Sequence, residues 1–280
     1  MNLSQNLESQ VIQTLKKINI NKKSRILVAL SGGKDSSVTA YILYKFGYNI
    51  EGFHIDLKIG DYSERCLEAV KKLSKELNIK LHVYNTKKEL GSGMCYLRTA
   101  IQSSYKANKK GQLKNCAICG VIKKWIMNKE ARRLKAKYIA TGHNLDDEAQ
   151  TFLMNIFKGS PKLSANSGAI TRNLPDKKNK FIPRIKPLFY VAENDIRKYS
   201  KEKKLPVVYD KCPCALDSYR IQVREFLNNL STKNKENIIK NLESIFDRIQ
   251  KTKDNQVKYC EICSEPARNK ICKKCELMKI

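Results

Sequence analysis

The chain has 280 residues, which allows one large domain with a smaller addition, and 41% hydrophobic residues permit a sizeable core. Its 55 basic and 27 acidic residues give a net charge of +28, which indicates a polyanionic partner such as nucleic acid, although a lysine-rich proteome would also produce this excess. Because no apolar run reaches membrane-spanning length and the N-terminus lacks a signal-peptide pattern, we expect no membrane contact and a cytoplasmic location.

Hydrophobic periodicity predicts an α/β architecture. Strands are expected at 26–30, 49–55, 80–84 and 138–141. Helices are expected at 3–18, from about 36, and at about 62–77, 125–134, 146–157, 192–203, 218–228 and 234–249. The polar stretch 161–179 is predicted to be a mobile loop. Strands that alternate with helices indicate a doubly wound parallel sheet, with ligands at the carboxyl ends of its strands.

The segment 31–36, Ser-Gly-Gly-Lys-Asp-Ser, follows the first buried strand. Gly32 and Gly33 let backbone N–H groups close around an anion, and the start of the next helix adds partial positive charge. Ser31 and Ser36 add hydroxyl donors. The segment therefore predicts a pyrophosphate cradle, with a plain glycine turn as the alternative. Its spacing fits neither the Walker loop nor the GxGxxG pattern.

Ten cysteines in a reducing compartment indicate metal binding or catalysis rather than disulfides. Cys116 and Cys119 form a mid-chain Cys-x-x-Cys pair, and Cys212 of the Lys-Cys-Pro-Cys segment 211–214 is the most suitable distant partner. Three thiolates would leave one coordination position open, as a catalytic metal or cluster requires. A redox pair or a buried pair remains the alternative. Cys66 and Cys95 have no partner by spacing, which predicts ordinary buried thiols.

The segment 138–151 is a second dense motif. Its strand ends at Thr141, Gly142 makes the turn, and the acidic residues 146–148 open a helix. Such an acidic group can bind magnesium, orient ATP or accept a proton. It can also simply cap the helix, because carboxylates are favoured at a helix N-terminus.

The C-terminus carries two Cys-x-x-Cys pairs, Cys260 with Cys263 and Cys272 with Cys275, separated by eight residues. Four thiolates at this spacing predict a tetrahedral zinc ion that replaces a hydrophobic core, forming a zinc ribbon. Two disulfides are the alternative. Basic residues around the pairs are compatible with RNA contact or with a purely structural cap.

In their order, these motifs, with Arg220 and Arg224 after Cys212, resemble the archaeal and bacterial tRNA 2-thiouridine synthetases of the N-type ATP pyrophosphatase superfamily. These are related to the cytosolic wobble-uridine thiolation proteins and to the tRNA 2-thiocytidine synthetases. The resemblance runs from about residue 25 to the C-terminus. It implies an adenine nucleotide alpha-hydrolase-like fold, divided into an N-terminal helix (1–22), a catalytic domain (23–210), a helical part completing the cluster site (211–256) and a zinc ribbon (257–280).

The resemblance also implies roles for individual residues. The ATP pyrophosphate would contact Ser31, Gly32, Gly33, Asp35 and Ser36. The adenine and ribose would lie near His54, Ile55 and Gly142. A 4Fe-4S cluster would be held by Cys116, Cys119 and Cys212, with Lys123 and Asp147 as further catalytic residues. The implied cofactors are ATP, Mg²⁺, the 4Fe-4S cluster and Zn²⁺.

The reaction implied is sulfur transfer to tRNA. The uracil C2 oxygen would attack the α-phosphate of ATP, and sulfur delivered through the cluster would then displace AMP. The expected partners are tRNA and a sulfur donor, either sulfide or the thiocarboxylate of a ubiquitin-like carrier, with a homodimer as the assembly. The alternatives are another adenylating enzyme of the lysidine synthetase type and a noncatalytic, zinc-containing RNA-binding protein.

Overall fold

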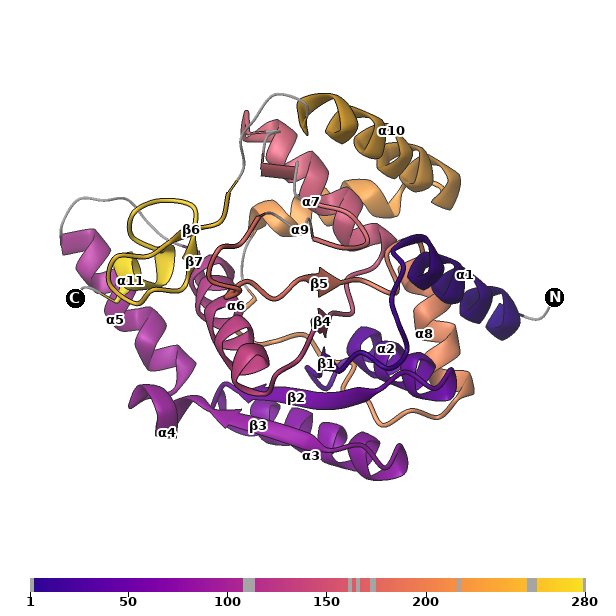
Figure 1. The fold of residues 1–280 in the computed structure, drawn as a ribbon, viewed down its shortest axis with the longest axis horizontal. Helices are drawn as coiled ribbons and strands as arrows, with labels where there is room; N and C mark the ends of the chain where they lie inside the picture. Colours follow the sequence, from indigo (N-terminus) through magenta and orange to yellow (C-terminus); the bar gives the residue numbers. More distant parts are fainter. Residues whose placement is uncertain are drawn as a thin grey trace.

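A five-stranded parallel sheet with the order β3-β2-β1-β4-β5 lies at the centre of the molecule (Figure 1). The structure is a computed structural model and describes residues 3–107, 114–160, 163–164, 167–171, 175–215, 218–250 and 256–278. The strands are β1 (Ile26–Ala29), β2 (Ile50–Asp56), β3 (Leu81–Asn85), β4 (Tyr138–Ala140) and β5 (Arg184–Ile185). The predicted parallel α/β fold is confirmed.

The strand order reverses between β1 and β4. From β1 the chain proceeds outward through β2 to β3, whereas β4 lies on the opposite side of β1 and is followed by β5. Ile26 of β1 aligns with Ile50 of β2 and with Tyr138 of β4, so these strands are in register. In sheets of this kind ligands bind in the crevice at such a reversal, outside the carboxyl ends of the strands. The loops after β1 and β4 therefore frame the expected site.

Helices surround this sheet and extend beyond it (Figure 1). They are α1 (Leu3–Lys17), α2 (Lys34–Lys45), α3 (Gly60–Glu76), α4 (Thr86–Leu90), α5 (Met94–Ala107), α6 (Asn115–Arg133), α7 (Leu145–Phe157), α8 (Glu193–Glu202), α9 (Ser218–Asn228), α10 (Thr232–Gln250) and α11 (Lys273–Leu277). None of these described helices combines the length and the apolarity that crossing a bilayer requires.

Alternation along β1 builds two separate cores, because successive side chains of a strand point to opposite faces. Ile26 and Val28 pack with α1, α2, α3 and α8, whereas Leu27 packs with α5, α6 and α11. A third core joins α7, α9 and α10 away from the sheet. The sheet is thus covered on both faces, which explains the continuous apolar run of β1.

The sequence prediction is wrong about the helix that carries the mid-chain cysteines. The helix α6 begins at Asn115 rather than near residue 125, so the Cys-x-x-Cys pair lies in its first turns. Burial of Ile118, Ile122 and Ile126, spaced four residues apart, stabilises this earlier start. Because cysteine and glycine have low helix propensity, the local sequence around Gly120 does not indicate that α6 begins at Asn115.

Other differences concern short elements. Before the C-terminal cysteine segment, the helices α4 and α5 and the two-residue strand β5 were not predicted, and the boundaries of the other elements, α6 excepted, shift by at most two residues. Within the predicted mobile loop at 161–179, residues 161–162, 165–166 and 172–174 lie outside the described residues, and Ile170 forms an isolated bridge with Ile185. The mobility of this loop and the division into four domains remain predictions.

The C-terminal cysteines lie on a small antiparallel hairpin of β6 (Lys258–Tyr259) and β7 (Pro266–Ala267), followed by α11. This ribbon packs against α6, because Leu277 is fully buried in the core that contains α6. Arg132 of α6 forms an ion pair with Glu265, which also accepts a hydrogen bond from Asn128 at 3.2 Å. The ribbon is therefore fixed to the catalytic core.

Candidate nucleotide and cysteine site

The loop between β1 and α2 has the shape of an anion cradle. Gly32 has a φ of +84°, and a Cβ there would lie 2.8 Å from Cα of Cys66, so the position requires glycine. The hydroxyl oxygens of Ser31 and Ser36 lie 3.1 Å apart, and the Ser36 hydroxyl donates to the carbonyl of Gly33 at 3.0 Å. No side chain caps the start of α2, so its first N–H groups are available to an anion.

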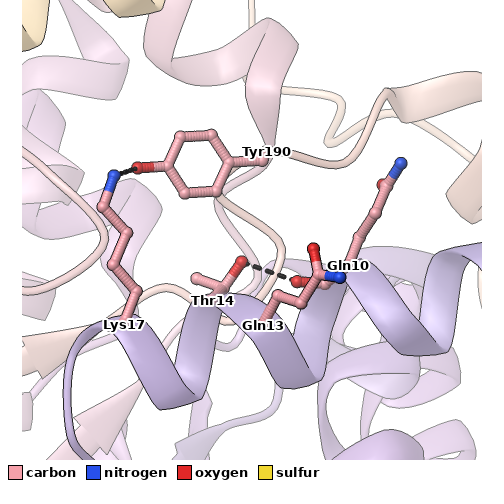
Figure 2. A pocket seen from close by; sticks show the side chains of 5 residues that line it. All are labelled: Gln10, Gln13, Thr14, Lys17 and Tyr190. Atoms are coloured by element: carbon pink, nitrogen blue, oxygen red, sulfur yellow. Dashed lines mark hydrogen bonds between the residues drawn. The ribbon is translucent and has the colours of Figure 1, made fainter.

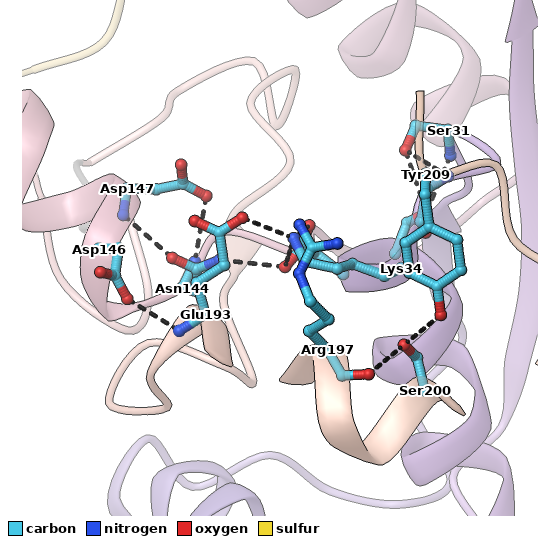
Figure 3. Close-up of polar contacts among 12 residues, drawn as sticks. Ser31, Lys34, Asn144, Asp146, Asp147, Glu193, Arg197, Ser200 and Tyr209 are labelled. Atoms are coloured by element: carbon cyan, nitrogen blue, oxygen red, sulfur yellow. Dashed lines mark hydrogen bonds and ion pairs between the residues drawn. The ribbon is translucent and has the colours of Figure 1, made fainter. Parts of the chain in front are cut away.

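The turn after β4 touches this loop directly. A Cβ at Gly142 would lie 2.6 Å from the carbonyl carbon of Asp35, so only glycine permits the contact. The side-chain amide of Asn144 donates to Asp35 at 3.0 Å, and its oxygen accepts from the backbone N–H of Asp147 at 3.0 Å (Figure 3). The two predicted motifs therefore form one site at the reversal of strand order.

Charged residues around Lys34 and Glu193 form a continuous network (Figure 3). Lys34 contacts Asp35 at 2.9 Å and Glu193 at 2.8 Å, and Arg224 contacts Asp147 at 2.9 Å and Glu193 at 3.3 Å. Burial raises the pKa of the Asp35 carboxyl against the opposing effect of Lys34, and the neighbouring Asp147 carboxylate raises it further. Two carboxylates close enough to repel each other offer the oxygen ligands that Mg²⁺ prefers.

The three acidic residues at the start of α7 have different roles. Asp146 is buried and pairs with Lys235 at 2.7 Å, while Glu148 is buried and pairs with Lys186 at 2.7 Å. Asp146 also accepts a hydrogen bond from the backbone N–H of Glu193 at 2.8 Å. Asp147 contacts Arg224 and completes a capping box with Asn144. Asp147 therefore both caps the helix α7 and takes part in the site.

The structure encloses His54 beneath the cradle. The side chain is 3% exposed, and its Nδ1–H donates to the carbonyl of Leu30 at 2.8 Å, directly before Ser31. Burial lowers the pKa of this imidazole, so the neutral ring supports the cradle from below. Ile55 lies beside it in β2 and is partly buried. Contact of either residue with the adenine or ribose remains a prediction.

The mid-chain cysteines and Cys212 gather on the face of the sheet that α6 covers. Cys116 is exposed in the first turn of α6, and Cys119 and Cys212 are half-buried in the same apolar cluster. Burial raises the pKa of Cys119, while Lys123 lowers it and Cys212 raises it, which places these groups within electrostatic reach of one another. The structure brings the predicted ligands and Lys123 together.

These three thiols are too widely spaced for a single metal ion. Among the described residues, the ligand atoms of Cys116, Cys119 and Cys212 are not all within 4.8 Å of one another, as a single metal ion would require. A cluster accepts wider spacing because each cysteine binds a different iron. The cation of Lys123 would offset part of the negative charge that three thiolates contribute.

The segment that carries Cys212 is attached to the nucleotide cradle. The backbone N–H of Val208 donates to the carbonyl of Gly32 at 2.8 Å, and Arg65 forms an ion pair with Asp210. This attachment has no signal in the sequence, because the partners lie far apart in the chain. Glu193 was not predicted as a site residue either, and nothing in the local sequence points to it. Asn144 was also missed, but its position as a helix N-cap shortly before two aspartates could have identified it.

The structure changes the interpretation of two further cysteines. Cys66 is buried, as predicted, and packs against Gly32. Cys95 was predicted to be an ordinary buried thiol without a partner, and this is wrong: it is half-buried, and its Sγ lies 3.8 Å from Sγ of Cys214. The partner lies 119 positions away, so local spacing could not find it.

The four C-terminal cysteines form a closed ligand set. The sulfur atoms of Cys260, Cys263, Cys272 and Cys275 all lie within 4.8 Å of one another. The backbone N–H of Cys272 donates to the sulfur of Cys260 at 3.3 Å. Burial opposes ionisation of Cys260, but backbone N–H groups outweigh it and lower the pKa of this thiol to about 6. Four convergent thiols, among them Cys260 with its lowered pKa, fit a tetrahedral zinc ion.

A group of basic side chains lies beside the acidic motif. His143 and Lys124 are exposed, yet nearby protein atoms desolvate both and lower their pKa values. Nearby cations lower the pKa of Lys124 further, namely Arg184, Arg268, Lys186 and Arg220. These side chains come from α6, β5, the ribbon and α9. This basic group can attract a polyanion toward Asp147.

A separate surface pocket lies on α1 (Figure 2). Its polar contacts hold the helix in place: Lys17 donates to the hydroxyl of Tyr190 at 2.6 Å, and Thr14 donates to the carbonyl of Gln10 at 2.8 Å. None of its lining residues belongs to the predicted motifs, which lie at the carboxyl ends of the strands.

Comparisons with known proteins agree with this site. The PP-loop domain family matches residues 3–231. The chain is 37% identical over 276 residues to the tRNA-5-methyluridine(54) 2-sulfurtransferase of Pyrococcus horikoshii, covering 96% of this chain and 83% of that protein. It is 32% identical to the cytoplasmic tRNA 2-thiolation protein 1 of Chlamydomonas reinhardtii, covering 97% and 76%. Its structure resembles the U34-tRNA thiolase NcsA from Methanococcus maripaludis with its 4Fe-4S cluster, with a TM-score of 0.79, 27% identity and coverage of 99% and 87%.

Proposed function

Because this chain belongs to the PP-loop family and, within it, to the tRNA 2-thiolation proteins, we propose that it replaces the C2 oxygen of a tRNA uridine with sulfur. The oxygen first attacks the α-phosphate of ATP, pyrophosphate leaves, and the base is adenylated. Sulfur then adds at C2, and AMP departs with the original oxygen. Activation is needed because a carbonyl oxygen is otherwise a poor leaving group.

The cradle and the acidic motif support the first step. The free N–H groups at the start of α2 and the hydroxyls of Ser31 and Ser36 hold the pyrophosphate that leaves. Asp35 and Asp147 would hold Mg²⁺, which would neutralise charge that develops on the phosphates. Lys34 is committed to Asp35 and Glu193, so it positions these carboxylates rather than the phosphates.

The second step requires sulfur beside the activated base. Cys116, Cys119 and Cys212 would hold the 4Fe-4S cluster. Because three cysteines would bind three of the four irons, one iron would remain available to hydrosulfide. Lys123, one helical turn after Cys119, stabilises negative charge near C2. The basic group around Lys124 holds the phosphates around the target nucleotide, which must leave its stack to reach the site.

The observation that carries this proposal is the hydrogen bond between Val208 and Gly32. It ties the segment ending in Cys212 to the nucleotide cradle, so activation and sulfur delivery share one site. A lysidine synthetase type of ligase has no need for this arrangement of cysteines, and a noncatalytic RNA-binding protein has no need for a cradle open to an anion. The homodimer, the cytoplasmic location and the identity of the sulfur donor remain predictions.

The test is anaerobic conversion of unmodified tRNA by cluster-reconstituted protein with Mg-ATP and sulfide. Mass spectrometry of nucleosides and RNA fragments should show ATP-dependent 2-thiouridine and its position, which distinguishes the position-54 and U34 targets of the relatives. The variant Cys116→Ala should lose the product, and this exposed position makes misfolding a small concern. Release of AMP without thiolation would contradict the sulfur step, and product without ATP would contradict the activation step.

A further inference from the structure

Cys95 and Cys214 form a thiol pair outside both predicted metal sites. Cys95 lies in the first turn of α5 and Cys214 in the turn that follows Cys212, with 3.8 Å between their sulfur atoms. Both side chains are half-buried, so a small sulfur compound can reach them. The two sulfur atoms are thus in contact, as the two thiols of a disulfide-forming pair must be.

The surroundings hold Cys214 in place against two helices. Its carbonyl accepts a hydrogen bond from the side-chain amide of Asn115 at 3.3 Å, and Asn115 in turn accepts one from Gln102 of α5 at 2.9 Å. The pair is therefore clamped between the start of α6 and the middle of α5. A clamp of this kind keeps two thiols together that lie 119 positions apart in the chain.

A buried cation lies beside both thiols. Arg98 is 8% exposed and lies one helical turn after Cys95 in α5, and its charge acts on Cys214, Cys95 and Cys119. A guanidinium beside two sulfurs stabilises the negative charge that passes between them during thiol exchange. Cys214, in the turn next to Cys212, is assigned the first attack, and Cys95 is the resolving thiol.

We propose that Cys95 and Cys214 form a sulfur-entry pair that takes sulfur from a persulfide and releases it as hydrosulfide beside the three-cysteine pocket. The Cys214 thiolate attacks the outer sulfur of a persulfide R–S–SH, giving Cys214–S–SH and the thiolate R–S⁻. The Cys95 thiolate then attacks Sγ of Cys214, forming the Cys95–Cys214 disulfide and expelling HS⁻. The pair loses two electrons, which reduce the transferred sulfur to sulfide, and a dithiol reductant restores both thiols.

The location makes this chemistry useful, and in this respect the inference rests on the proposed function. Cys214 is two residues from Cys212, and the charge of Arg98 reaches Cys119 as well. Hydrosulfide would thus be produced where the thiolation reaction consumes it. Free sulfide in solution bypasses the pair, whereas a persulfide donor requires it.

The first experiment follows the pair itself, without tRNA or ATP. Full-length protein is mixed anaerobically with glutathione persulfide, and released hydrosulfide and alkylated cysteine peptides are measured. Wild-type protein should release one hydrosulfide for each Cys95–Cys214 disulfide, at least about tenfold faster than Cys95→Ser or Cys214→Ser. Cys95→Ser should accumulate a persulfide on Cys214. The variant Cys66→Ala, which removes a neighbouring buried thiol, should release hydrosulfide as the wild type does.

Three results would overturn the inference: persulfide on Cys116, Cys119 or Cys212 instead of Cys214, hydrosulfide release without the disulfide, or a disulfide formed by the oxidant diamide but not by the persulfide. The disulfide in wild-type protein is informative even if a variant fails to fold. A second experiment compares tRNA thiolation from the two donors, where Cys95→Ser should work with sulfide and lose at least about tenfold with the persulfide. If wild-type protein failed to thiolate tRNA with sulfide, the proposed function would be contradicted. The first experiment would still test the cysteine pair, because it uses neither tRNA nor ATP.

Discussion

The two cysteine regions differ in how the chain builds them. The C-terminal ribbon places four thiols within 4.8 Å of one another using only the residues from Cys260 to Cys275. The central region combines thiols from α5, α6 and the segment after α8, with one exposed cysteine and two cations, Lys123 and Arg98, among them.

This difference separates a structural site from a reactive one. A closed tetrahedral set uses every position of its metal and stabilises a small fold, whereas an incomplete set leaves room for a substrate. Cations beside partly accessible sulfurs favour reaction, while backbone N–H groups around buried sulfurs favour permanent binding of a metal. The following predictions test this contrast.

The largest expected effect is on catalysis. Cys119→Ala should lower tRNA thiolation by at least about 10³-fold, because it removes a proposed ligand of the sulfur-delivering cluster, while zinc content and thermal stability stay close to wild type. Thiolation rates, zinc analysis and a melting curve provide the measurements. Loss of zinc in this variant would show that the two regions are coupled.

The reverse pattern is expected for the ribbon. Cys275→Ala should release the zinc and lower the stability of the ribbon by about 3 kcal/mol or more, because the metal replaces a core. Hydrogen exchange should rise across 256–278 but not in β1 or β2. The exposed Glu261→Gln in the same ribbon is the control. Unchanged exchange in Cys275→Ala would mean that packing on α6 alone folds the ribbon.

A substitution at one glycine should weaken ATP binding at the cradle without disturbing either cysteine region. Gly142→Ala would place a Cβ 2.6 Å from the backbone of Asp35, so it should weaken ATP binding by about 2 kcal/mol, or roughly 30-fold, measured by calorimetry. Gly120→Ala, next to Cys119, meets nothing within 4 Å and should retain ATP binding. Equal losses in both variants would contradict the close contact as the cause.

The ion pair between ribbon and core should have a smaller effect. Glu265→Gln removes the buried charge that faces Arg132 and should lower stability by about 1 kcal/mol, with zinc retained. Denaturant unfolding followed by the fluorescence of Trp125, which lies between Lys129 and Lys274, reports on this interface. A loss of zinc would show instead that docking holds the metal site together.

The smallest effect is a pH dependence from a buried histidine of the core. Burial keeps the pKa of His54 below 6.5 in the fold, so the unfolded chain binds more protons just below pH 6.5. Stability should therefore fall as the pH drops from 6.5 toward the lowered pKa, and His54→Gln should reduce this slope. An unchanged slope would assign it to other groups.

Much of the site was predictable because it depends on local sequence. The cradle at 31–36, the turn at Gly142 and the two C-terminal cysteine pairs each have fixed spacing that reports on backbone shape and ligand geometry. The alternation of apolar segments predicted the parallel sheet for the same reason.

By itself, the sequence determined these local units, since a turn or a knuckle needs only neighbouring residues. Tertiary structure decided which units meet: the bond from Val208 to Gly32, the contact of Gly142 with Asp35, and the pairing of Cys95 with Cys214. Each joins segments far apart in the chain, whose approach depends on the packing of the sheet and its helices. The early start of α6 likewise follows from burial of its isoleucines rather than from its helix propensity.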